Sequence, residues 1–341
     1  MDTFAFITHP ADINQVIRNW GLARFVPTFL LKEIIRRRQP FKLADITNVK
    51  SISGVETKGY FIALPLLPEQ ILKLNYDLVF NKVILAGRIA ENLGAKILGL
   101  GAYTSVFGDK GISVAKELHI AVTTGNSYTV ATVIKGILKA SRLMNINLSK
   151  AKLAVIGATG SIGKACVKIL ADRIPHIIIN ARHQDRLEEL KSFIQSQYST
   201  TIKIEKNSKE AVRDADLVIT TSSAPTALID ANDLKKGAVA CDVSVPKNIS
   251  RKTSLRNDVL IFDGGLVEVP SEVKFGVNTG LAKNLIHACV AEVMILALSR
   301  KFEDYSLGDN LDLLKIEEIS ALAKMHGFKI AEIQKEGEIN G

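Results

Sequence analysis

The stretch Lys152–Gly163, KLAVIGATGSIG, decides the fold expected for this chain. A short apolar strand, Leu153–Ile156, runs into Gly157, Gly160 and Gly163, and an amphipathic segment that reads as a helix follows. The first glycine permits the tight turn, the second leaves room for a pyrophosphate beside the backbone, and the third lets the helix pack close to the sheet. Because amide groups at a helix N-terminus attract phosphates, the stretch predicts a dinucleotide-binding strand, loop and helix.

The next strand indicates which dinucleotide is bound. The segment His176–Asn180 is expected beside the first strand, and an NAD site usually carries an acidic residue at this strand's end. The chain instead continues with Ala181, Arg182 and His183. The guanidinium of Arg182 presents a fork of donors that suits a 2′-phosphate, which favours NADPH. The other reading of Arg182 is a solvated residue at the start of a helix.

Apolar strands alternate with helical stretches through the second half of the chain, a pattern typical of a doubly wound parallel sheet. We therefore expect an α/β protein with a Rossmann-type domain of this kind and a separate α/β substrate domain. The predicted strands of the Rossmann-type domain are Leu153–Ile156, Ile177–Asn180, Ile202–Ile204, Leu217–Thr220, Val239–Asp242 and Leu260–Phe262.

The 341 residues suit two domains. We expect residues 1–130 to form the substrate domain, 131–150 a linking helix and 151–274 the NADP-binding domain. Residues 275–341 are expected to fold back on the substrate domain and to begin with a long helix, Leu281–Arg300.

The net charge of +9 suits an acidic partner, such as a carrier protein, a nucleic acid, an anionic membrane face or a phosphorylated cofactor. The first twenty residues do not read as a signal peptide, and no stretch has 18 apolar residues in a row, so no transmembrane segment is expected. The three cysteines, Cys166, Cys241 and Cys289, lack metal-ligand spacing and suit the reducing cytoplasm.

A set of short motifs, taken together and in order, resembles the long-chain acyl-[acyl-carrier-protein] reductases known from cyanobacteria. That family reduces fatty acyl thioesters to aldehydes with NADPH. The motifs are Val49-Lys50-Ser51 with Gly54, Thr123-Thr124-Gly125-Asn126, Gly157-Ala158-Thr159-Gly160-Ser161-Ile162-Gly163, Ala181-Arg182, Pro246-Lys247-Asn248, Gly264-Gly265, Ala288-Cys289 with Ala291-Glu292, and His326-Gly327-Phe328.

The resemblance implies that Cys289 is the nucleophile that accepts the acyl group from its carrier. By itself, a cysteine inside an apolar helix is more often an inert core residue. Asn126 and Tyr128 are candidates for helping Cys289, or else are turn and capping residues at a helix start. The family usually has His where this chain has Tyr128.

The cofactor-binding residues follow from the glycine loop, from the resemblance and from a turn at the carboxyl end of a Rossmann strand. In the cytoplasm, an acidic acyl carrier protein is expected as a transient partner and a fatty acyl group as substrate; peripheral membrane contact also remains open. The basic run Arg36–Arg38 is a candidate docking patch, or simply a solvated helix end. The expected cofactor contacts are Gly157, Thr159, Gly160, Ser161, Ile162, Gly163, Ala181, Arg182, Thr221 and Ser222.

Three other functions are compatible with a two-domain plan of this kind. A shikimate-type or amino-acid-type dehydrogenase would need a Lys–Asp pair beside a small polar substrate, whereas the stretch Phe61–Leu67 is apolar and suits an acyl chain. Glutamyl-tRNA reduction would need an RNA-binding domain, which the sequence does not suggest, so no nucleic acid partner is expected. A non-catalytic NADP-sensing protein is the remaining alternative.

Overall fold

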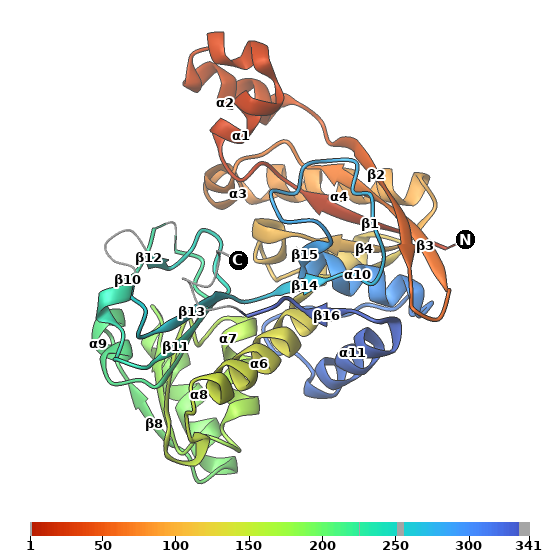
Figure 1. Ribbon diagram of the computed structural model, residues 1–341. Helices are drawn as coiled ribbons and strands as arrows, with labels where there is room; N and C mark the ends of the chain where they lie inside the picture. The colour runs from red at the N-terminus through yellow and green to blue at the C-terminus, as the bar shows by residue number, and fades with distance from the viewer. Residues whose placement is uncertain (1, 225, 251–255, 334–341) are drawn as a thin grey trace. The chain divides into compact units, whose positions relative to one another are not determined.

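A computed structural model describes residues 2–224, 226–250 and 256–333, and it shows two compact units (Figure 1). The first unit comprises Met1–Asn126, Val267–Asp309 and Glu318–Lys329, and the second comprises Ser127–Leu266, Asn310–Glu317 and Ile330–Gly341. The segment predicted to link the domains thus groups with the second unit, and the C-terminal region is shared between the two.

A five-stranded sheet with the order β2-β3-β1-β4-β5 forms the centre of the first unit. Strands β1, β3, β4 and β5 are parallel, and β2 pairs antiparallel with β3 at the edge. The strands are β1 (Thr3–Thr8), β2 (Phe41–Lys50), β3 (Glu56–Ala63), β4 (Ala95–Leu100) and β5 (Ala121–Thr123).

Alternating side chains of these strands pack against helices on opposite faces of the sheet. Ala5 and Ile7 belong to the core formed with α4, whereas Phe6 lies against Gly99 and Val293 of α10 on the other face. The helices of this unit are α1 (Ile13–Asn19), α2 (Thr28–Arg37), α3 (Pro68–Lys73), α4 (Tyr76–Asn92), α5 (Ile112–Glu117) and α10 (Ala288–Leu298), with 3₁₀ turns η1 (Gly21–Phe25) and η2 (Ala102–Ser105).

The second unit contains a six-stranded, all-parallel sheet with the order β13-β11-β9-β6-β7-β8. This order reverses direction between β6 and β9, as in a dinucleotide-binding fold. The predicted α/β class and doubly wound parallel sheet are therefore confirmed. The strands are β6 (Lys152–Ile156), β7 (His176–Asn180), β8 (Thr201–Ile204), β9 (Leu217–Thr220), β11 (Val239–Asp242) and β13 (Leu260–Asp263).

Helices flank this sheet, and short elements complete the described chain. The helices are α6 (Asn126–Leu143), α7 (Ser161–Leu170), α8 (Gln184–Gln197) and α9 (Ser208–Arg213), with turns η3 (Leu148–Lys150) and η4 (Ala231–Asp233) and the short strand pair β10 (Ile229–Asp230) and β12 (Ile249–Ser250). The remaining elements are β14 (Leu266–Glu268), β15 (Leu285–His287), α11 (Leu313–His326) and β16 (Lys329–Ile330).

The prediction of one long helix over Leu281–Arg300 is wrong at its start. Turns occupy the chain before β15, with the N–H of Gly280 bonded to the Asn278 side chain and Asn284 in the left-handed region at φ 65°. Helix α10 begins only at Ala288. An apolar run suggested a continuous helix, but the local turn chemistry of Asn and Gly overrides it.

No helix in the described parts of the chain is both long enough and apolar enough to cross a membrane.

Candidate active site

The glycine loop of the second unit has the geometry that a dinucleotide requires. Gly157 has φ 85°, and a Cβ there would lie 2.8 Å from the backbone nitrogen of Ser222. A Cβ on Gly163 would lie 2.4 Å from the carbonyl oxygen of Gly157, so α7 could not pack as it does. A Cβ on Gly160 would meet nothing closer than 3.4 Å, which leaves space beside the first turn of α7. The N–H groups of that turn lack helical acceptors and can bind phosphates.

The hydroxyl of Thr221, at the carboxyl end of β9, is within 3.2 Å of the carbonyl oxygens of both Ile156 and Gly157, to which it donates. The hydroxyl oxygen of Ser222 accepts the N–H of Ala224. Thr221 therefore braces the glycine turn and Ser222 its own loop, and the backbone of both lies at the sheet edge where cofactors bind.

The end of β7 lacks the acidic residue of an NAD site. Asn180 stands there instead, and its amide donates to the carbonyl oxygens of Glu205 and Lys206, at 2.7 and 3.0 Å. Asn180 is thus engaged in joining two loops. Two residues later, Arg182 is exposed and forms no ion pair with the described residues. A 2′-phosphate would provide the anion that this guanidinium lacks.

Replacing Arg182 with Ala is expected to weaken NADPH binding by about 1–3 kcal/mol, because one charge-assisted contact is lost. NADH binding should change little, since NADH carries no 2′-phosphate. Titrations of both cofactors against both proteins measure this. Arg173 is a matched control, since it is also exposed but lies before β7, at the opposite sheet edge. Equal affinity of the wild type for NADPH and NADH would exclude the assignment.

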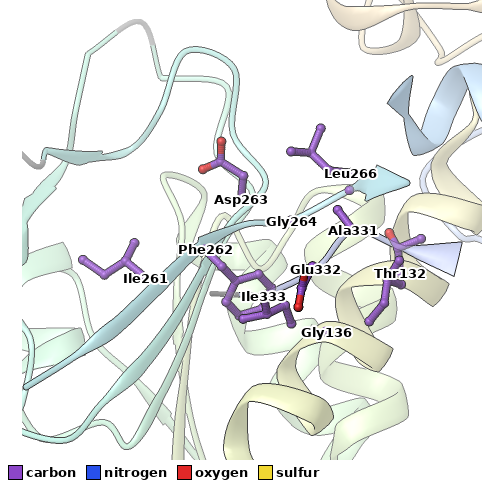
Figure 2. Close-up of a pocket in the computed structure, with 12 residues that line it drawn as sticks. Thr132, Gly136, Ile261, Phe262, Asp263, Gly264, Leu266, Ala331, Glu332 and Ile333 are labelled. Carbon is purple, nitrogen blue, oxygen red and sulfur yellow. The ribbon is translucent and has the colours of Figure 1, made fainter. Parts of the chain in front are cut away.

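A pocket of about 210 Å³ lies at the carboxyl end of β13 (Figure 2). Its walls come from α6, from the segment following β13 and from residues 330–333, and Phe262 packs against Gly136. The motif Gly264-Gly265 supplies backbone to its wall without bulky side chains. The pocket was not predicted from the sequence, although the glycine pair that follows a predicted strand could have indicated it.

Cys289 lies in the first turn of α10, with His287 at the N-cap position. In the predicted helix Leu281–Arg300, Cys289 would lie about two turns from the start, where the helix N-terminus has little effect. The late start of α10 corrects this, and the thiol now lies where the positive end of the helix dipole favours a thiolate.

Gly125 packs directly against Cys289. A Cβ on Gly125 would lie 2.3 Å from the Cα and 2.4 Å from the Cβ of Cys289, and Gly125 has φ 74°. Gly125 immediately precedes α6, so the chain enters a second helix beside the same cysteine. The strands that end at this edge, β1, β4 and β5, are parallel, and ligands bind at such carboxyl edges.

A fully buried carboxylate holds this arrangement. Glu292, on α10, accepts hydrogen bonds from the hydroxyls of Thr123 and Ser306, at 2.5 and 2.7 Å. The Thr123 hydroxyl in turn accepts the N–H of Gly125, at 3.2 Å. The network therefore ties the end of β5, and with it Gly125, to the helix that carries Cys289.

Cys289 is partly exposed, yet protein atoms surround its thiol closely enough to raise its pKa to about 12. Burial is the main cause of this rise. The N–H of Val290 opposes it and the carboxylate of Glu292 adds to it. A raised pKa favours the neutral form, so Cys289 is a thiol at neutral pH in the protein described here.

Iodoacetamide should therefore modify Cys289 slowly at pH 7, and the rate should rise about tenfold per pH unit while the pH stays below the thiol pKa. Peptide mass spectrometry over a pH series measures it. Glu292→Gln keeps the hydrogen-bond acceptor but removes the charge, so it should lower the pKa and speed the reaction at every pH. A rate that is already maximal at pH 7 would contradict a raised thiol pKa.

The other two cysteines are fully buried, as expected for packing residues. Cys166 lies on α7 and Cys241 on β11, and burial raises the pKa of both thiols, to about 12 for Cys166. The sulfur of Cys241 fills the space that a Cβ on Gly264 would need.

The two candidate helpers of Cys289 are both buried. Asn126 follows Gly125 directly and is the first residue of α6, so it lies near Cys289 within the first unit. Tyr128 belongs to the second unit, and burial raises the pKa of its phenol, which remains protonated at neutral pH. Their part in the chemistry stays a prediction.

A lysine–aspartate pair was not predicted. Lys110 and Asp309 form an ion pair in the first unit, and the N–H of Gly308 donates to the carbonyl oxygen of Lys110. A Cβ on the adjacent Gly111 would lie 3.5 Å from the Thr124 side chain, so the pair is close to the end of β5. Its partners are 199 residues apart in the sequence, so no local motif could reveal it.

The sequence profile of the shikimate/quinate 5-dehydrogenase family matches residues 139–263, which lie within the second unit. The second unit has the Rossmann-type fold of NAD(P)-dependent oxidoreductases. These matches agree with the expectation that the cofactor is NADPH.

Two curated relatives extend over most of the chain. The aminotransferase PigE of a Serratia species is 28% identical over 98% of this chain but only 40% of its own length. The long-chain acyl-[acyl-carrier-protein] reductase of Synechococcus elongatus is 27% identical over 85% of this chain and 87% of its own. This chain therefore spans less than half of PigE.

Among solved structures, L-tryptophan dehydrogenase from Nostoc punctiforme aligns over 95% of this chain and 82% of its own, with 12% identity and a TM-score of 0.40. The nucleotide-binding domain of glutamyl-tRNA reductase from Thermoplasma volcanium aligns over 39% of this chain and 84% of its own, with 15% identity and a TM-score of 0.28.

Proposed function

We propose that this oxidoreductase reduces long-chain fatty acyl thioesters to aldehydes with NADPH, through an acyl group carried on Cys289. The observation that carries the proposal is the contact between Gly125 and Cys289, which sets a partly exposed thiol in the first turn of α10 at the carboxyl edge of the first sheet. The similarity to the Synechococcus reductase supports it.

The proposed chemistry begins when the Cys289 sulfur attacks the thioester carbonyl. The carrier thiol leaves, taking up the proton that Cys289 gives up, and the acyl group stays on Cys289 as a new thioester. Bound NADPH supplies the hydride that this chemistry needs. Uptake of one proton from water and breakdown of the resulting thiohemiacetal return the Cys289 thiol and release the aldehyde.

Protein groups around Cys289 act on the charge that develops in this reaction. The first turn of α10 presents N–H groups to the negative charge that develops at sulfur or at the carbonyl oxygen. The proton of the neutral resting thiol passes to the departing carrier thiol, and Asn126 and Tyr128 remain candidates for helping Cys289. The carboxylate of Glu292 is occupied by two hydroxyl donors.

The acyl carrier is proposed to be an acidic acyl carrier protein, in keeping with the net charge of +9. The predicted docking patch, Arg36–Arg38, is less available than its sequence suggested. Arg36 and Arg37 both bond to Glu33, at 2.6 and 2.7 Å. The surface that would meet the carrier is therefore left unassigned.

A dehydrogenase acting on a small polar substrate is the second candidate. The Lys110–Asp309 ion pair near the end of β5 is the feature that this candidate needs, and the family profile matched by residues 139–263 agrees with it. That profile covers neither Cys289 nor the ion pair.

Parallel assays that follow the formation or consumption of NADPH separate these candidates. Palmitoyl-carrier protein and palmitoyl-coenzyme A test the first, and shikimate and tryptophan with NADP⁺ test the second. We expect aldehyde from the acyl thioesters and no turnover of the small substrates. Turnover of shikimate or tryptophan without aldehyde formation would reject the proposed function.

A further inference from the structure

The first unit carries a projecting pair of helices whose outer surface is apolar. Helices α1 and α2, joined by η1, extend away from the sheet (Figure 1). The side chains of Leu22, Phe25 and Phe29 are 69%, 72% and 71% exposed. We call the outer apolar surface of these elements the apolar tip, and its residues are Trp20, Leu22, Phe25, Phe29, Leu30 and Ile34.

This exposure does not arise from poor packing of the helices. Ala23, Leu31 and Ile35 are buried and form a small core of their own with apolar residues of α1. The N–H of Gln15 bonds to Asp12, which caps α1, at 2.7 Å. The segment therefore has a packed inner face and, separately, an apolar outer face that meets water. Large apolar surfaces of this kind usually mark an interaction site.

The segment that carries the apolar tip is basic. Residues 12–38 contain six arginines and lysines against two acids. Both acids are engaged: Asp12 caps α1, and Glu33 pairs with Arg36 and Arg37. Arg18 and Arg24 are exposed, and the guanidinium of Arg24 lies 4.7 Å from the centre of the Phe25 ring.

We propose that the apolar tip inserts into the interfacial layer of an anionic lipid membrane. Exposed Trp, Phe and Leu side chains beside arginines are the combination that peripheral helices use to enter the boundary between head groups and acyl chains. The arginines bind lipid phosphates, and the rings displace water from the apolar layer beneath.

A membrane suits the surface better than an acidic carrier protein does. A carrier protein that docks through charges would meet guanidinium groups, yet here exposed aromatic and aliphatic side chains form much of the surface and charged groups flank them. Insertion into lipid buries apolar side chains without requiring a complementary protein surface. The proposal is independent of the reaction that Cys289 carries out.

The protein contains its own reporter, because Trp20 is its only tryptophan and belongs to the apolar tip. Mixing the protein with vesicles of phosphatidylcholine and phosphatidylglycerol should shift the Trp20 emission to the blue, and lipids brominated along their chains should quench it. Pure phosphatidylcholine vesicles should bind at least about tenfold more weakly, because the arginines lose their anionic partners.

The double variant Phe25→Ser, Phe29→Ser should bind anionic vesicles at least about tenfold more weakly in sedimentation assays, since two exposed rings are lost. Leu314→Ser is the matched control, because Leu314 is 74% exposed but lies on α11, and this variant should bind like the wild type. Unchanged thermal unfolding of both variants would show that they fold normally.

Two results would overturn the membrane assignment. The first is sedimentation of the double variant with anionic vesicles at wild-type affinity. The second is a Trp20 shift with acyl carrier protein, or with rising concentration of this chain alone, and no shift with vesicles, which would assign the surface to a protein partner.

Discussion

Cys289→Ala is expected to lower NADPH-dependent reduction of acyl thioesters by about 10⁴-fold or more, because it removes the nucleophile. Binding of NADPH should be unchanged, because the glycine loop is a separate part of the fold in the second unit. Stopped assays of aldehyde formation and a cofactor titration on the same preparation measure the two quantities.

Cys166→Ala is the control for this variant. It removes a thiol that is fully buried on α7, so it should lose some stability but keep its activity per folded molecule. Normal aldehyde output from Cys289→Ala would mean that hydride reaches the carrier-bound acyl group directly, or that another residue is the nucleophile.

Gly125→Ala is expected to give the second large effect, a loss of most activity together with about 2–5 kcal/mol of stability. The added methyl group would overlap the backbone and the Cβ of Cys289, and neither can move away as a flexible side-chain end could. The positive φ of Gly125 adds strain of its own for a residue with a Cβ. Denaturant unfolding and steady-state kinetics measure the two losses.

Gly54→Ala separates these two causes. Gly54 has φ 86°, but a Cβ there would meet nothing within 4 Å. Its substitution should cost only the conformational strain, about 1–2 kcal/mol, and leave activity unchanged. If Gly125→Ala and Gly54→Ala lost the same activity and the same stability, the close approach of Gly125 to Cys289 would not matter for function.

The fold of the nucleotide-binding half could be predicted because residues that are close in the sequence determine its strands and turns. The run Lys152–Gly163 contains the strand, all three glycines and the start of the helix, and Gly157 and Gly163 adopt the close contacts that the pattern requires. Each of the six parallel strands was recognisable as a short apolar run between polar helical stretches.

The surroundings of Cys289 were not predictable in the same way. The apolar sequence around Cys289 continues smoothly across the true helix start, so only the turns near Gly280 and Asn284 reveal that α10 begins at Ala288. The contact between Gly125 and Cys289 depends on the packing of a strand end against a helix 164 positions later. The hydrogen bonds of Glu292 likewise join distant segments, and no spacing rule predicts them.

Strand β2 is also difficult to recognise from the sequence. Strand β2 runs from Phe41 to Lys50 and pairs with β3 along most of its length, with two irregularities in register. Its charged and polar residues suit an edge strand, where one face meets water. Such a strand has little of the apolar pattern by which strands are recognised.

The most direct test of the central claim is the mass of the protein after mixing with palmitoyl thioester in the absence of NADPH. We expect that one palmitoyl group is added, that it lies on the peptide containing Cys289, and that NADPH then removes it as the aldehyde. An acyl group on a peptide other than that of Cys289, or aldehyde formation with no acylated protein at any time, would contradict it.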